Sequence, residues 1–69
     1  MTWAWRFEDR GGRPVEGGEL AGAEFSAQGD AESWLGETWR ELVEAGVDQV
    51  VLLEDSRIVY GPMSLHPAG

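Results

Sequence analysis

The chain begins with an alternation of large aromatic residues and smaller or charged ones, in the order Trp-Ala-Trp-Arg-Phe-Glu over residues 3–8. A period of two residues is typical of a strand with one buried and one wetter face. The glycine pair that follows at residues 11–12 suits a tight turn. We therefore predict a hairpin over residues 3–16 whose second strand, around Arg13–Glu16, is short because Pro14 has no N–H to donate.

Residues 17–29 contain four glycines among Glu, Ala and Ser, a composition that predicts a Gly-rich connector. Phe25 is its expected anchor to the core. An alternative is a strand around Glu24–Ala27 that replaces Arg13–Glu16 as the partner of the first strand.

Residues 30–46 change to the helical period. At ~100° per residue, one line along the helix collects the residues expected to face the core, namely Ala31, Leu35, Thr38, Leu42 and Ala45.

The expected ends of this helix are also marked. Asp30 is placed to act as N-cap, and Gly46 suits the left-handed conformation that closes a helix. On the outer side, Arg40 is expected to pair with Glu44 and Glu37.

A second hairpin is predicted over residues 48–60. Its first strand contains the apolar run Val-Val-Leu-Leu, as expected for a central strand covered on both faces or for one covered partly by a neighbouring molecule. Residues 54–56 form the turn, and the return strand, 57–60, should stop at the Gly-Pro pair that follows. Residues 61–69 are left as a tail with Leu65 as a possible anchor.

These elements predict one α+β domain over residues 1–69, with the order ββαββ and one amphipathic helix packed on one face of a small antiparallel or mixed sheet. The strand order stays open. The other face of the sheet should be polar, be thinly covered by the connector, or form an interface.

The charge of the chain limits its partners. Five Arg against thirteen Asp and Glu give a net charge of −8, which repels nucleic acid and anionic membranes and favours a basic protein surface. No segment approaches the ~20 apolar residues that cross a bilayer, and cysteine is absent, so we expect a cytoplasmic protein.

The residues that usually perform catalysis are scarce. His66 is the one histidine, it lies in the predicted tail, and no serine stands in a recognisable triad pattern. Neither a metal-ligand motif nor a phosphate-binding glycine motif is present. We therefore predict no catalytic residue, no cofactor site and no metal site.

The tryptophans and the acidic helix carry the functional hypothesis. The four tryptophans can form much of the core, yet Trp34 and Trp39 lie on opposite shoulders of the helical stripe, where a ring can stay exposed. With Glu37, Glu41 and Glu44 they form the predicted partner-binding set. The preferred function is a small non-catalytic interaction or regulatory module that docks on a basic partner.

Two alternatives stay open. One is a homo-oligomer, such as a homodimer, that associates through the uncovered sheet face or the edge strand. The other is an enzyme or small-ligand binder that uses a pair of carboxylates.

The segments WRFED, DAESWLGETWREL and VYGPMSL resemble those of a family of small, acidic, uncharacterised actinobacterial proteins. The resemblance covers most of the chain outside residues 17–29. It implies no activity and no site.

Overall fold

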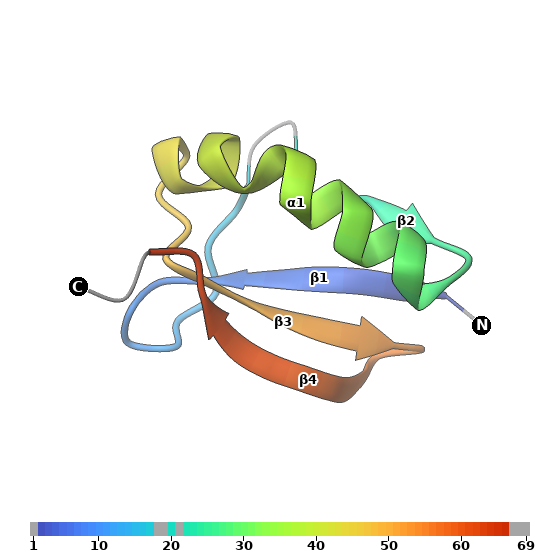
Figure 1. Ribbon diagram of the computed structural model, residues 1–69. Coiled ribbons are helices and arrows are strands. Elements are labelled where there is room, and N and C mark those ends of the chain that lie inside the picture. The colour runs from blue at the N-terminus through green and yellow to red at the C-terminus, as the bar shows by residue number, and fades with distance from the viewer. Residues whose placement is uncertain (1, 18–19, 21, 67–69) are drawn as a thin grey trace.

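A computed structural model describes residues 2–17, 20 and 22–66 and shows one helix lying across a four-stranded sheet (Figure 1). All strand pairs are antiparallel, in the order β2-β1-β3-β4. The predicted α+β architecture and its ββαββ order are confirmed. In chain order the elements are β1 (Trp3–Glu8), β2 (Glu24–Phe25), α1 (Gln28–Glu44), β3 (Gln49–Glu54) and β4 (Arg57–Ser64).

The outer partner of β1 is β2, so the predicted second strand around Arg13–Glu16 is wrong and the alternative is correct. Trp3 pairs with Phe25, whereas the predicted strand contributes only an isolated bridge between Pro14 and Glu8. The missing N–H of Pro14 explains why a ladder does not continue there.

The start of α1 differs from the prediction. The N-cap is Ala27, which makes no side-chain capping hydrogen bond. Asp30 is therefore not the cap. It lies in the first turn, where its charge still interacts favourably with the positive end of the helix dipole.

The other end of α1 closes as predicted. Gly46 has a φ of +95°, and the Val47 N–H donates to the Leu42 carbonyl oxygen at 2.9 Å. This left-handed closure turns the chain down into β3.

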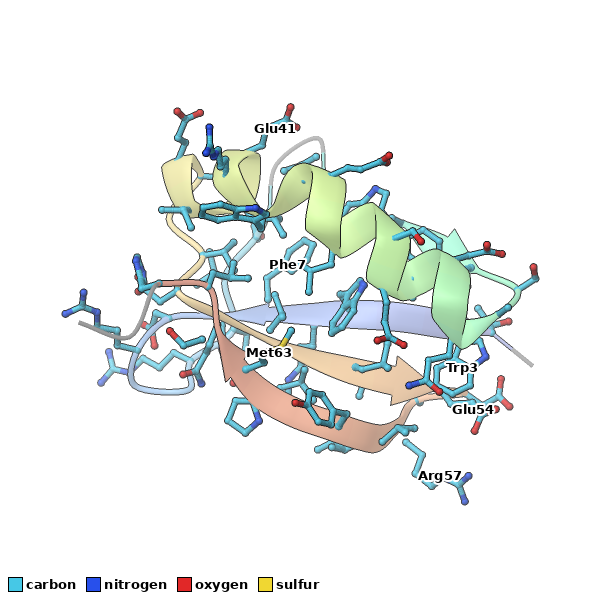
Figure 2. All side chains as sticks on the ribbon, viewed as in Figure 1. Trp3, Phe7, Glu41, Glu54, Arg57 and Met63 are labelled. Atoms are coloured by element: carbon cyan, nitrogen blue, oxygen red, sulfur yellow. The ribbon has the colours of Figure 1, made fainter. Side chains whose placement is uncertain are left out.

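The core lies between α1 and the sheet, where the apolar stripe of the helix meets alternate residues of β1 and β3. Figure 2 shows Phe7 between the two layers. Leu65 is 8% exposed, which confirms it as an anchor, whereas Ala45 lies beyond the helix and is exposed. The buried cluster comprises Trp5, Phe7, Ala31, Leu35, Leu42, Val47, Val50, Leu52 and Leu65.

The β3–β4 hairpin turns at Asp55 and Ser56, whose φ angles of 50° and 70° are those of a two-residue turn. β4 then continues through Gly61 and Pro62 to Ser64, so the predicted stop at the Gly-Pro pair is wrong. Pro62 is tolerated because β4 is an edge strand and its missing N–H leaves no inner strand unpaired.

Gly61 keeps β4 close to β3. Its φ is +117°, and a Cβ at this position would lie 2.9 Å from the Val50 carbonyl oxygen. Gly36 is the opposite case, because a Cβ there meets nothing within 4 Å.

We predict opposite effects for the same substitution at these two glycines. Gly61→Ala should lower the free energy of unfolding by about 1–3 kcal/mol, because of backbone strain and the contact with β3. Gly36→Ala should raise it by up to about 1 kcal/mol, since alanine favours a helix interior. Urea denaturation of both variants checks this, and a loss of stability in Gly36→Ala would contradict the open space described beside it.

Candidate functional site

A groove opens between α1 and the β3–β4 side of the sheet. It exists because α1 packs over β1 and β2, so a single helix does not reach across to β4 (Figure 1). Its volume is about 510 Å³, within the range of ligand-binding clefts. The large apolar residues that line it are Trp5, Leu35, Trp39, Leu52, Met63 and Leu65.

The helical wall comes from one stripe of α1 beside its buried face. Gln28, Glu32, Gly36 and Trp39 follow one another at spacings of three or four residues, which places them on the same side of the helix. Gly36 has no side chain, so the middle of this wall is open.

The opposite wall comes from β4. Tyr60 and Met63 line the groove from this strand, and Figure 2 shows the Met63 side chain directed towards the helix layer. Tyr60 pairs with Leu52 of β3 and is 58% exposed, because nothing of α1 covers it.

The polar character of the groove is confined to a few groups. The Trp5 indole N–H donates to the Ala31 carbonyl oxygen at 2.9 Å, so this ring presents a satisfied, apolar surface. Glu32 is the one charged residue among the described residues that line the groove. Within residues 2–17, 20 and 22–66 its carboxylate forms neither an ion pair nor a side-chain hydrogen bond.

The two tryptophans of the predicted partner-binding set lie on different sides of α1. Trp34 stacks on Phe7, with ring centroids 6.3 Å apart, and tilts against Phe25 at 5.5 Å, so it belongs to the core on the β2 side. Trp39 is 36% exposed and lines the groove. Of the two, Trp39 presents the accessible ring.

The acidic members of that set lie on the outer part of the helix. Glu37, Glu41 and Glu44 are exposed and none lines the groove; Figure 2 shows Glu41 directed away from the sheet. The predicted pairs of Arg40 with Glu37 and Glu44 are absent from the ion pairs of the described residues. Instead, the Arg40 guanidinium lies 5.3 Å from the centroid of the Trp39 ring, a cation–π contact.

The sequence interpretation missed the groove because its two walls come from segments that are far apart in the chain, residues 28–39 and 60–65. The local pattern predicts a strand end at Tyr60 and a tail at Met63. It does not predict which residues these side chains contact. The available signal was Gly36, an unfavourable residue in a helix interior that leaves space beside Trp39.

His66 has a partner that the sequence did not reveal. Its Nε2 lies 2.7 Å from Asp48 Oδ1, and this hydrogen bond holds the pKa of the Asp48 carboxyl below its ordinary value. Ser64 is nearby, but its hydroxyl accepts from the His66 backbone N–H at 3.1 Å. The hydroxyl–imidazole bond of a hydrolytic triad is therefore not made by these three residues in this arrangement.

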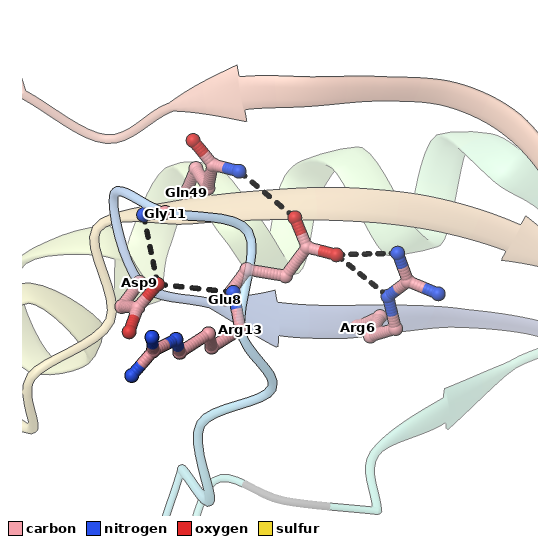
Figure 3. Close-up of polar contacts among 6 residues, drawn as sticks. All are labelled: Arg6, Glu8, Asp9, Gly11, Arg13 and Gln49. Carbon is pink, nitrogen blue, oxygen red and sulfur yellow. Dashed lines mark hydrogen bonds and ion pairs between the residues drawn. The ribbon is translucent and has the colours of Figure 1, made fainter.

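A second polar cluster lies on the face of the sheet away from α1 (Figure 3). The Gln49 amide donates to Glu8 at 2.8 Å, and Arg6 Nε donates to the other carboxylate oxygen at 2.8 Å. Glu8 is only 3% exposed. These hydrogen bonds, first that of Gln49 and then that of Arg6, lower the pKa of Glu8, so it stays ionised and stabilises the pairing of β1 with β3.

No protein-family model, curated protein or solved structure matches this chain. In the part of the chain that the structure describes, no helix is long and apolar enough to cross a bilayer. The same part holds no group of three or more His, Cys, Asp or Glu side chains arranged to bind a metal. The groove is thus the candidate site on geometric grounds alone.

We predict that Glu8→Gln removes an acid-sensitive part of the stability. Because the folded pKa of Glu8 lies below its ordinary 4.5, the carboxylate stabilises the fold above that value, and this is lost as the pH falls through the folded pKa. Between about pH 6 and about pH 3 the wild type should lose more free energy of unfolding than the variant. Urea denaturation across this range measures the difference.

Glu37→Gln, at an exposed position of α1, is the control and should keep the pH dependence of the wild type. Identical pH profiles for wild type and Glu8→Gln would show that the cluster in Figure 3 does not stabilise the sheet.

Proposed function

We propose that the protein is a small non-catalytic interaction module that docks on a basic partner protein through the groove between α1 and β4. The observation that supports this most is the groove itself. It presents the exposed rings of Trp39 and Tyr60 and the half-buried Met63 beside a strongly acidic helix. Apolar contacts in a concave site give affinity, and surrounding charge selects the partner and speeds association.

The charge of α1 supports the choice of a basic partner. The helix carries five carboxylates against one guanidinium, that of Arg40, which itself stacks on Trp39. The predicted carboxylates Glu37, Glu41 and Glu44 act in this proposal at long range, since they lie outside the groove. Their field falls off within about 8 Å at physiological salt.

The proposal includes no reaction and no cofactor. The polar clusters support this, because the Glu8 carboxylate and the Ser64 hydroxyl are already bonded within the fold. The cytoplasm is the proposed compartment, in keeping with a chain that contains no cysteine.

We predict that Gly36→Leu blocks partner binding without unfolding the protein. The added side chain would fill the open middle of the helical wall, where a Cβ meets nothing within 4 Å. Affinity capture from the native host, at low and high salt, should recover a partner with the wild type, more weakly at high salt. Binding of that partner to purified protein should fall by at least ~10-fold with Gly36→Leu, as expected when an anchor pocket is filled.

Gly29→Leu is the matched control, because Gly29 is also in α1 and has open space around it but does not line the groove. It should bind like the wild type. Equal binding by all three proteins, or no partner at all, would contradict docking through the groove.

A second candidate function is association between copies of this chain. Three consecutive large apolar residues of the edge strand β4 are exposed, Ile58 at 57%, Val59 at 43% and Tyr60 at 58%. Edge strands with exposed apolar side chains tend to pair with another chain.

If β4 forms such an interface, light scattering over a dilution series should show a dimer that dissociates on dilution. Ile58→Lys should shift it to monomer, because lysine on an edge strand opposes strand pairing. A monomer at every concentration would remove this function and leave the groove proposal unaffected.

A further inference from the structure

We infer that the groove takes a short extended segment of the partner with a cationic side chain at one end and apolar side chains behind it, the cation lying at Glu32. This inference rests on the proposed function and specifies the chemistry of the partner. It is supported by the distribution of charge along the groove, by its exposed aromatic rings and by its size.

Among the described residues, the lining of the groove carries a single charge, which is negative. Glu32 lines the groove from the N-terminal half of α1 and has no ion-pair partner among the described residues. The Arg40 guanidinium stacks on Trp39 but does not line the groove, and the exposed Glu41 and Glu44 follow it in α1. Residues 32 and 39 are seven positions apart, which is about 10 Å along the helix and more than the Debye length of about 8 Å at physiological salt. A cation is therefore attracted most strongly at Glu32, and the apolar part of the occupant lies towards Trp39.

The aromatic and apolar side chains that line the groove suit the rest of the partner segment, beyond its cation. Tyr60 is 58% exposed, and an aromatic face attracts a guanidinium or ammonium group. Beyond it, Met63, Leu65 and Trp39 offer apolar surface but no anion, so the residues that follow the cation should be uncharged. Arginine and lysine also carry apolar stems that can lie along such surface.

The volume indicates how much of a partner can enter. About 510 Å³ exceeds what one side chain requires and falls in the range of clefts that bind drug-sized ligands. A segment of a few residues fits this space, whereas a complete protein surface would contact only its rim.

The test uses two synthetic peptides, acetyl-Arg-Leu-Leu-amide and its counterpart with citrulline, an uncharged isostere, in place of arginine. Each is titrated into isotopically labelled wild type, Glu32→Gln and Glu37→Gln, with amide and indole N–H shifts recorded by NMR. The two variants carry the same change in net charge, but only Glu32 lines the groove.

The expected result is that the arginine peptide shifts the signals of Trp39, Tyr60 and Met63 and binds the wild type roughly 2- to 5-fold more tightly than the citrulline peptide, the scale of one exposed ion pair. Glu32→Gln should abolish most of this preference. Glu37→Gln should retain it.

Equal affinity for the two peptides, equal effects of the two variants, or no shift at the groove with either peptide would each overturn the inference. The proposed function is judged separately, by the loss of the native partner in Gly36→Leu. If the native partner fails to bind Gly36→Leu but binds Glu32→Gln as tightly as the wild type, docking through the groove is supported. The cation at Glu32 is then excluded.

Discussion

The fold depends on the contact of one helical stripe with one part of the sheet. Leu35 and Leu42 of α1 pack into a cluster with Trp5, Phe7 and Leu52 of β1 and β3. A helix is about 10 Å wide, and neighbouring strands lie about 4.8 Å apart, so one helix covers roughly two strands well. Seated over β1, α1 cannot also cover β4, and the groove follows from this shortage of helical surface.

The exposed wall of the groove leaves apolar surface unburied, which lowers the stability of so small a domain. Burial of apolar surface stabilises a chain by about 25 cal/mol per Å², and 69 residues have little of it to spare. Nevertheless Tyr60 is exposed, and Gly36, which lowers helix stability, keeps the opposite wall open. Both features weaken the isolated chain, and the proposed docking function would account for them.

Local pattern predicted most of the elements but not all of their partners. The predictions of β1 from its alternation and of α1 from its helical period are confirmed, because each pattern matches a face that is buried. The predicted strand partner of β1 and the predicted end of β4 were wrong, because pairing with distant strands outweighed the local preference of the sequence. Pro14 could not extend a ladder, so the distant Phe25 pairs with β1, and the Gly-Pro pair at 61–62 did not end β4 because an outer strand tolerates it. For the candidate site, the sequence grouped Trp34 and Trp39 as rings that can stay exposed without distinguishing them, and in the structure Trp39 lines the groove whereas Trp34 packs on Phe7.

The sequence by itself determined the ββαββ order, the stripe of α1 and the excess of acidic residues, because these depend on neighbours within a few positions or on simple counts. Only the tertiary structure decided which strand lies beside which and therefore which side chains remain uncovered. Glu32 and Tyr60 are 28 residues apart in the chain and line one groove. They meet because strand order and the position of the helix are set by the packing of the whole core, and local periodicity contains no information about that packing.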